Sequence, residues 1–350
     1  MDSAILKVFI PFTISFLMGL LITPWVTHYL YKHKMWKTSA KTTGIDGREA
    51  PVFNSLHKYK EVGTPRMGGI VIWGAVALTT IIFWTLPQIV DTGSITRLSF
   101  LSRGQTWLPL ASLILGAIIG LADDLLQIKN AGGAHGGLSL SKRIIGVLLI
   151  GLIGAMWFYF KLGMTAMWIP FVGLINIGWL TIPLFILVML AMFSGGIIDG
   201  LDGLSGGIFT IMYSSYALIA FYQMQYDIAA FSAVVAGATL AFLWFNIPPA
   251  RFYMTETGSL GLTITLSVIA FLTDTVFILL FIGFPLLAEA GSDIIQILSK
   301  KFRGKKVFHI APIHHHFEAI GWPAYKVTMR FWIIGILTSV IGIVVAIAGK

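Results

Sequence analysis

Residues 5–30 read ILKVFIPFTISFLMGLLITPWVTHYL, and this stretch decides the class of fold. The run is long enough to cross the hydrocarbon core of a bilayer, which takes about 20 apolar residues. It is too long for the apolar core of a secretion signal, and no small-residue cleavage site stands before the basic stretch that follows. These residues therefore predict a membrane-spanning helix that the mature protein retains.

The composition extends this prediction to the whole chain. Of 350 residues, 57% are hydrophobic and 11% are charged, and the mean hydropathy is +0.86, whereas a soluble domain carries about 25% charged residues. The alternating pattern of a membrane β-barrel is absent. The absence of cysteine excludes disulfides and thiolate metal sites. We predict an all-α polytopic membrane protein, and a single integral-membrane domain over residues 1–350 because no long polar linker interrupts it.

The apolar runs predict about ten membrane-spanning helices. They lie at about 5–30, 69–89, 108–122, 144–160, 171–193, 205–222, 228–246, 259–273, 275–298 and 331–349. If the connections alternate between the two sides, one side receives 19 of the 24 Lys and Arg residues. The positive-inside rule makes that side cytoplasmic and places both termini outside. Anionic lipid headgroups would also favour the basic face.

Two acidic segments fall on the predicted cytoplasmic side. Asp123 and Asp124 end an apolar span, where carboxylates are costly unless they are paired, hydrated or bound to metal. Adjacent side chains on a helix point about 100° apart, so both could line one wide cleft and hold Mg²⁺, which prefers oxygen ligands. Asp199 and Asp202 are three residues apart in a glycine-rich loop, so one helical turn would place them on one face. The alternatives are an interfacial helix end and a solvated turn.

Three further polar segments join the same side. Residues 63–69 form a Gly/Pro-rich turn that, with nearby lysines, suits an anion. Asn246 ends a span, and Glu256 precedes a new helix that it could cap. Residues 314–316 are three consecutive histidines, which can bind phosphate, move protons or hold metal. Just before them, a polar stripe shares one face of the ninth span, which Pro285 is expected to kink; its members are Glu289, Asp293 and Gln296.

These residue types suit a metal-bridged phosphate or diphosphate reaction with one lipid-soluble partner. Lysines and histidines would screen charge or donate protons. No Walker A sequence is present, which argues against an ATP-driven pump. An ion-coupled transporter also uses intramembrane acids, but here most acids lie near one surface and no internal repeat is visible. A catalytically inactive scaffold or lipid binder is a third possibility.

Several motifs give the chain a family resemblance. Residues 199–204 read DGLDGL, residues 311–318 read APIHHHFE, and Asp123 and Asp124 precede both in the expected order. The chain resembles the polyprenyl-phosphate N-acetylhexosamine-1-phosphate transferase superfamily, and within it the phospho-N-acetylmuramoyl-pentapeptide transferase type. The resemblance implies a bacterial plasma-membrane enzyme with a cytoplasmic active site, which converts UDP-N-acetylmuramoyl-pentapeptide and undecaprenyl phosphate into lipid I and UMP with Mg²⁺. It also implies a homodimer among membrane lipids and no nucleic-acid partner.

The resemblance also assigns roles to residues. The aspartate pair and Glu256 would be catalytic and would hold the metal, with one aspartate acting as a base, a metal ligand or a covalent nucleophile, and His314 would act beside them. The remaining implied substrate contacts are Lys60 (or Lys58), Thr64, Asp199, Asp202, Asn246, Ser259, Gln296, His315 and His316.

The chain departs from the family pattern at several positions. Thr255-Glu256 stands where the family has Gly-Asp, and Glu256 carries one more methylene than the aspartate. The other departures are Arg66 for Thr, Gln127 for Lys, Gly196 for Asn and Ala324 for Glu. Three outcomes fit these changes: an active divergent transferase, an enzyme for another UDP-sugar such as UDP-N-acetylglucosamine, or an inactive relative.

Overall fold

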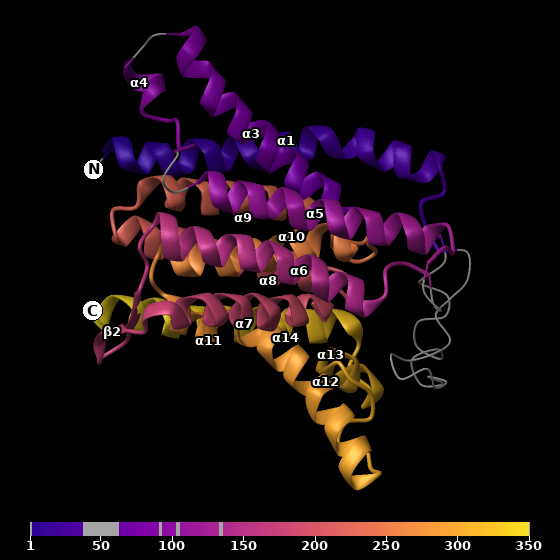
Figure 1. Ribbon diagram of the computed structural model, residues 1–350. Helices are drawn as coiled ribbons and strands as arrows, with labels where there is room; N and C mark the ends of the chain where they lie inside the picture. Colours follow the sequence, from indigo (N-terminus) through magenta and orange to yellow (C-terminus); the bar gives the residue numbers. More distant parts are fainter. Residues whose placement is uncertain (1, 38–62, 91–92, 103–105, 133–135, 350) are drawn as a thin grey trace.

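A computed structural model describes residues 2–37, 63–90, 93–102, 106–132 and 136–349. The described chain is mostly helical, and its long helices run side by side (Figure 1). Both ends of the chain lie at the same end of the bundle (Figure 1). This arrangement agrees with the expectation that both termini face one side of a membrane.

The long helices are α1 (Asp2–Lys32), α3 (Gly69–Ile89), α5 (Trp107–Ile128), α6 (Leu140–Met156), α7 (Thr181–Ser194), α8 (Leu204–Tyr222), α9 (Tyr226–Asn246), α10 (Thr255–Leu272), α12 (Phe284–Arg303) and α14 (Ala324–Ala348). The short ones are α4 (Gly93–Thr96), α11 (Leu279–Ile282), α13 (Ile313–Ala319), a π turn (Trp157–Lys161) and 3₁₀ turns at Gly178–Leu180, Gly195–Ile198 and Val276–Ile278. Among the described residues, nine helices are long and apolar enough to span a membrane, or ten if one bent pair is a single span. The prediction of about ten spans is confirmed.

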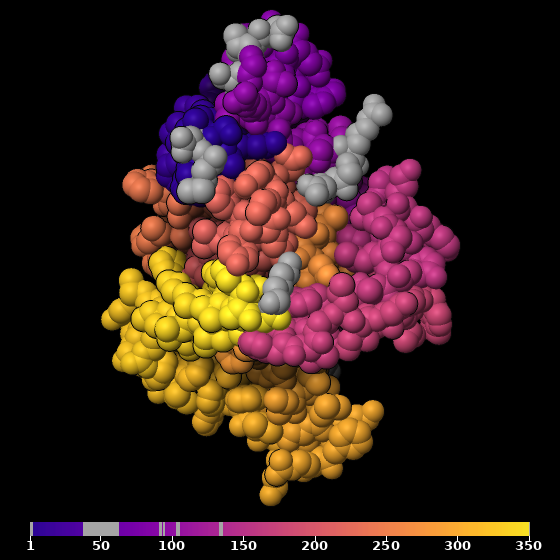
Figure 2. Space-filling model, turned by 90° about the vertical axis from the view of Figure 1, so that its left-hand side faces the viewer, coloured from indigo at the N-terminus to yellow at the C-terminus, as the bar shows by residue number. Residues whose placement is uncertain are grey.

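The bent pair corrects the predicted ninth span, 275–298. The chain turns by 79° between Val276–Ile282 and Phe284–Arg303, so α12 does not continue the direction of α11. Figures 1 and 2 show α12 projecting from the body of the molecule. Pro285 stands in the first turn of α12, where its missing N–H costs no helical hydrogen bond. The expected kink is therefore a complete break.

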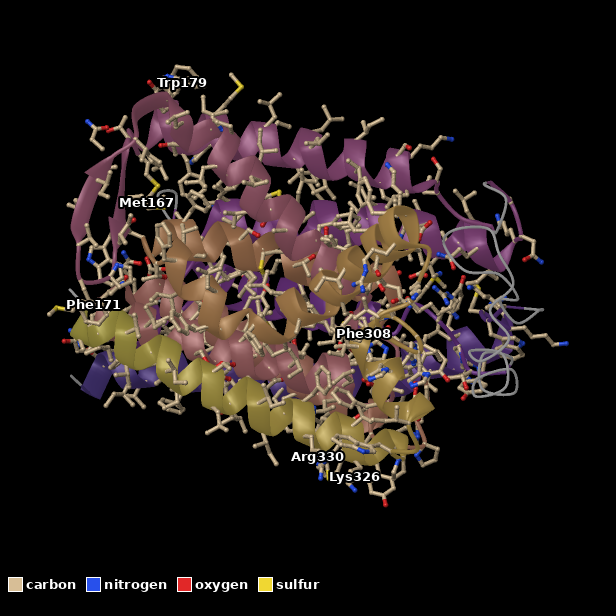
Figure 3. The ribbon with its side chains drawn as sticks, turned by 90° about the horizontal axis from the view of Figure 1, so that it is seen from below. Met167, Phe171, Trp179, Phe308, Lys326 and Arg330 are labelled. Carbon is tan, nitrogen blue, oxygen red and sulfur yellow. The ribbon has the colours of Figure 1, made fainter. Side chains whose placement is uncertain are left out.

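The predicted span 171–193 is wrong at its start. Strands β1 (Ala166–Ile169) and β2 (Gly173–Asn176) form an antiparallel hairpin that pairs Ala166 with Asn176. Figure 1 shows β2 at the end of the bundle where the two termini lie, and in Figure 3 the hairpin turn, marked by Phe171, lies well apart from Lys326 and Arg330. Helix α7 begins only after the hairpin, at Thr181.

Helix α1 packs against α9, although they are far apart in the sequence. The Ser15 hydroxyl donates a hydrogen bond to the carbonyl oxygen of Val234, at 2.8 Å. Lys7 forms an ion pair with Asp227. Because an unpaired charge within a membrane is costly, this ion pair ties the start of α1 to the start of α9.

Glycines let three helices approach closely where the site lies. A Cβ at Gly120 of α5 would lie 1.9 Å from the Glu256 carbonyl oxygen of α10. A Cβ at Gly69 of α3 would lie 2.4 Å from the Gly258 Cα. Small residues at such spacing let membrane helices pack backbone to backbone. These contacts bring the turn before α3, the acids of α5 and the start of α10 together.

Candidate active site

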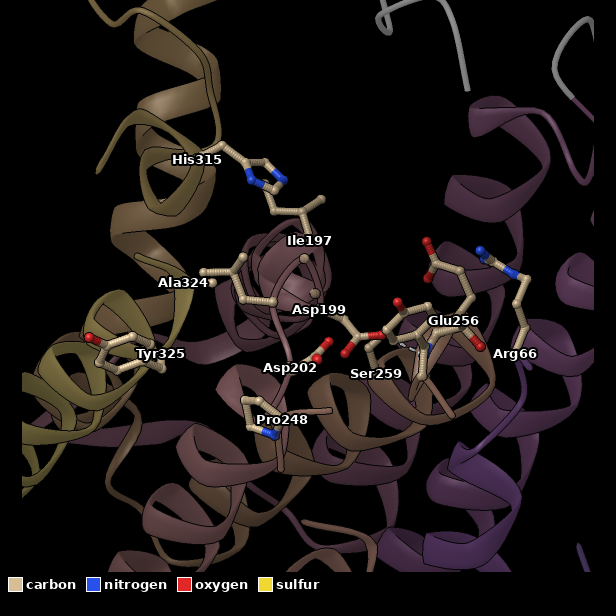
Figure 4. Close-up of a pocket in the computed structure, with 15 residues that line it drawn as sticks. Arg66, Ile197, Asp199, Asp202, Pro248, Glu256, Ser259, His315, Ala324 and Tyr325 are labelled. Carbon is tan, nitrogen blue, oxygen red and sulfur yellow. Dashed lines mark hydrogen bonds between the residues drawn. The ribbon is translucent and has the colours of Figure 1, made fainter. Parts of the chain in front are cut away.

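A cavity of about 500 Å³ opens at the end of the bundle away from the termini. Figure 4 shows Arg66 and Glu256 on one side of it and His315 and Tyr325 on the other, with Asp199 between them. Its walls come from the turn before α3, the 196–202 segment, the start of α10 and the α13–α14 region. The lining residues are Arg66, Gly196, Ile197, Asp199, Gly200, Leu201, Asp202, Pro248, Tyr253, Thr255, Glu256, Ser259, His315, Ala324 and Tyr325.

Asp199 and Asp202 both line this cavity, but from a turn rather than from the helical face that their spacing suggested. The Asp199 carboxylate accepts hydrogen bonds from the Ser205 hydroxyl and the Thr255 N–H, both at 2.6 Å. Burial raises the pKa of Asp199, and these two hydrogen bonds oppose the shift. Asp202 accepts a hydrogen bond from the Ala250 N–H at 3.2 Å. The turn thus holds two acids at the cavity wall.

Asp124 lies behind the cavity wall, fully buried. Its Oδ1 accepts hydrogen bonds from Arg66 Nε and Nη2, at 3.2 and 2.9 Å. Its Oδ2 accepts hydrogen bonds from the Thr257 N–H and hydroxyl at 3.0 and 2.6 Å, and from the Thr255 hydroxyl. Both carboxylate oxygens are therefore occupied, and Asp124 does not line the cavity as the sequence had suggested.

Asp123 is buried beside it and does not line the cavity either. It accepts hydrogen bonds from the Leu138 N–H at 2.6 Å and from the Gln127 side chain at 2.8 Å. Both aspartates belong to α5, which extends to Ile128, so the span predicted at 108–122 is too short. Glu256 does line the cavity, and its carboxylate forms an ion pair with Arg143.

The consecutive histidines occupy different environments. His314 is fully buried, and its Nδ1 lies 2.8 Å from a carboxylate oxygen of Glu289. Burial alone would lower the pKa of His314, but the charge of Glu289 and the hydrogen bond to it raise that pKa above its ordinary value. His315 lines the cavity, and its Nδ1 lies 2.7 Å from Glu318. His314 thus stands behind the wall, while His315 faces the cavity.

Of the other predicted site residues, Ser259 lines the cavity, whereas the remaining ones that the structure describes lie away from its wall. His316 stacks on His309, with ring centroids 5.4 Å apart, and burial and that neighbour lower the pKa of His316. The Asn246 side chain accepts a hydrogen bond from the Gly203 N–H and donates one to the Phe252 carbonyl oxygen. The Gln296 side chain accepts hydrogen bonds from the backbone N–H groups of residues 307 and 308 and donates one to the carbonyl oxygen of residue 308. Thr64 does not line the cavity, and Lys58 and Lys60 lie outside the described residues.

The predicted Mg²⁺ ligands do not fit a metal ion as they stand. Asp124 has both oxygens occupied by hydrogen bonds, and the Glu256 carboxylate is paired with a guanidinium. Within the described ranges, no three His, Asp or Glu side chains cluster in a way that could hold a metal. Mg²⁺ takes about six oxygen ligands in near-ideal octahedral geometry, and these carboxylates offer few free ones.

Sequence reasoning missed three important side chains. Arg143 pairs with Glu256 and lies 3.9 Å from an Asp123 oxygen. Thr255 and Thr257 hold Asp124. A buried carboxylate needs such donors, so the aspartate pair itself was the signal that partners had to exist.

Comparisons with known proteins identify the family of this chain. The model of glycosyl transferase family 4 matches residues 106–274. A phospho-N-acetylmuramoyl-pentapeptide-transferase of Bacillus pumilus is 36% identical, over 82% of this chain and 85% of that protein. One of Geobacillus kaustophilus is 32% identical over 97% of both chains, and one of Bacillus subtilis is 35% identical over 82% and 85%. The family-model match spans Asp123, Asp124, Asp199, Asp202 and Glu256. The identity and coverage of the relatives show that the chain belongs to the family of phospho-N-acetylmuramoyl-pentapeptide-transferases.

Proposed function

We propose that this multi-pass membrane protein transfers phospho-N-acetylmuramoyl-pentapeptide from its UDP derivative to undecaprenyl phosphate, giving lipid I and UMP. The observation that carries the proposal is the cavity at one end of the bundle, where an arginine, three carboxylates and a histidine meet. Such a set can bind a charged nucleotide sugar beside the apolar spans that would hold a lipid. We place this end on the cytoplasmic face of the bacterial plasma membrane, and we expect a homodimer.

The chemistry requires one bond exchange at phosphorus. A phosphate oxygen of the lipid attacks the phosphorus that carries the sugar, and a new P–O–P bridge forms. The original diphosphate bond breaks, and UMP leaves with the bonding electron pair. Positioning and charge stabilisation supply most of the catalysis in such reactions.

Different cavity residues would bind different parts of the substrate. The Arg66 guanidinium would bind the diphosphate oxygens, since guanidinium matches phosphate geometry. Asp199 and Asp202 would accept hydrogen bonds from the nucleoside or the sugar. His315, oriented by Glu318, would face the sugar-phosphate side. Asp123 and Asp124 would act indirectly, because Asp124 fixes Arg66 rather than touching the cavity.

The test is UMP release by purified protein in detergent with undecaprenyl phosphate and UDP-N-acetylmuramoyl-pentapeptide. Asp199→Asn removes a cavity charge and should lower the rate about a hundredfold. Asp227→Asn, at the other end of the bundle, is the matched control. Its amide oxygen can still accept a hydrogen bond from Lys7, so this variant should keep the rate. Release only with UDP-N-acetylglucosamine would identify another donor, and no release with either donor would indicate an inactive relative.

A further inference from the structure

We propose that Arg66 takes the place of a divalent cation in this site, so that its guanidinium neutralises the substrate diphosphate and the transfer needs no metal ion. The inference rests on the proposed function, because it concerns the same cavity and the same substrate. Three independent features of the structure support it: the state of the acids, the free donors of Arg66, and where the family departures meet.

Two of the three predicted metal ligands are already neutralised by arginine side chains. Arg66 is bound to Asp124, and Arg143 is bound to Glu256, while Asp123 is held by Gln127 and the backbone. A metal ion would have to displace a guanidinium from at least one carboxylate. It would also sit beside two fixed positive charges, which repel it. Asp124 and Glu256 therefore bind arginine side chains in this structure.

Arg66 keeps donors for a ligand. A guanidinium has five N–H donors in a planar fork, and only Nε and Nη2 are bonded to Asp124. The side chain is 17% exposed and lines the cavity. It is the only Lys or Arg among the described residues of the cavity wall. Burial lowers the pKa of Arg66, but Asp124 outweighs this effect and raises it, so the charge is permanent.

The departures from the family pattern meet at this point. Arg66 stands where the resemblance implies Thr, and it binds Asp124. Thr255 stands where the resemblance implies Gly, and its hydroxyl binds the other oxygen of Asp124 while its N–H binds Asp199. Thr255 has φ +53°, a left-handed conformation that a β-branched residue rarely adopts. Strain of this kind persists only where the surroundings enforce it.

The third departure completes the arrangement. Glu256 replaces Asp, and its longer side chain reaches the guanidinium of Arg143. Three changes thus act on one cluster of side chains. Arg66 supplies a cation, and Thr255 fixes Asp124, the carboxylate that binds this cation. Glu256 is itself paired with Arg143. A guanidinium binds phosphate oxygens in a bidentate manner that a hydrated cation does not.

Three measurements test the proposal on the full chain in detergent. Mn²⁺ binding is followed by electron paramagnetic resonance, and UDP binding is followed by calorimetry with EDTA present; UMP release is then compared with EDTA and with Mg²⁺. The variants are Arg66→Thr, which restores the family residue, and Arg66→Lys, which keeps the charge without the fork. Arg251→Thr removes an exposed arginine that stacks over Phe245 and serves as the control.

We expect the wild-type protein to leave Mn²⁺ free, to bind UDP in EDTA, and to release UMP in EDTA at no less than about half its rate in Mg²⁺. Arg66→Thr should weaken UDP binding in EDTA at least tenfold and gain Mn²⁺ binding, because Asp124 is freed. The UDP affinity of Arg66→Lys in EDTA should lie between those of the wild type and Arg66→Thr. Arg251→Thr should match the wild type in UDP affinity, Mn²⁺ binding and UMP release.

Stoichiometric Mn²⁺ binding by the wild type, or UMP release that EDTA abolishes and Mg²⁺ restores, would overturn the proposal. The two binding measurements need no turnover, and the wild-type arm needs no variant to fold. If UMP release failed under all conditions, the proposed function would fail alone, and UDP affinity in EDTA would still decide the role of Arg66.

Discussion

The contact between α5 and α10 at Gly120 allows a quantitative prediction for Gly120→Ala. The added Cβ would lie 1.9 Å from the Glu256 carbonyl oxygen and 2.7 Å from the Thr257 nitrogen. An ordinary carbon–oxygen contact is about 3.3 Å or longer, so the two backbones must separate by about 1.4 Å. The shift falls on the turn that carries Glu256 and on the Thr257 N–H that bonds Asp124.

Two consequences follow from this displacement. Overpacking of this kind costs about 1–3 kcal/mol of stability, so the melting temperature in detergent should fall. A displacement of about 1 Å at a reacting site can cost about a hundredfold in rate, so UMP release should fall by that order.

Gly291→Ala in α12 is the matched control for this change. Its Cβ would meet no heavy atom within 4 Å, and Ala favours a helix over Gly by up to about 1 kcal/mol. This variant should be at least as stable as the wild type. If Gly120→Ala melted and turned over like Gly291→Ala, the close packing of α5 on α10 would not position the site, and our reasoning would be wrong.

Three further predictions concern the surroundings of the cavity. Thr255→Val removes a hydroxyl that bonds buried Asp124, so we expect the free energy of unfolding to drop by about 1–3 kcal/mol. The raised pKa of His314 means that its pair with Glu289 stabilises the fold fully below about pH 6.5. This contribution is lost as the pH rises through the folded pKa, so the melting temperature should fall over that range, and Glu289→Gln should flatten the dependence. Gly200→Ala would place a Cβ 2.2 Å from His314 Nε2, so UDP should bind at least about tenfold more weakly in calorimetry.

Each of these changes has its own control. Thr255→Ser keeps the hydroxyl, and equal stability of the Val and Ser variants would contradict the role of that hydrogen bond. An unchanged pH dependence in Glu289→Gln would show that the pair with Glu289 is not the titrating contact. Gly291→Ala, which lies outside the cavity wall and adds a Cβ with no heavy atom within 4 Å, is the control, and the Gly200 argument fails if both Ala variants bind UDP equally.

Much of the fold could be predicted from apolar runs alone, because a lipid-facing helix must be continuous and about 20 residues long. The exceptions have physical reasons. The strand Gly173–Asn176 falls within the predicted span because the apolar residues at 171–175 lead directly toward the helix that follows, so hydropathy could not separate them. The break before α12 and a simple kink share the same sequence signal, Pro285. In both places the local composition is compatible with two backbone paths.

Part of the cavity lining was predictable from the sequence, but the pairing of the charged residues was not. Asp199, Asp202, Glu256 and His315 reach the cavity, as polar residues at a membrane end were expected to. The pair between Arg143 and Glu256 joins residues 113 positions apart, and no local periodicity encodes it. Long-range partners of buried charges depend on helix packing, which only the folded chain shows.

The packing of α1 on α9 has a consequence for the order in which the protein assembles during synthesis. Ser15 and its acceptor Val234 are 219 residues apart. At about 5–20 residues per second, a ribosome needs about 10–45 s to make the intervening chain. During that interval α1 waits in the bilayer, with Lys7 lacking the partner that Asp227 later provides. The first helix made is therefore among the last to be locked in place, and a nascent chain cut off before α9 would leave it without its main neighbour.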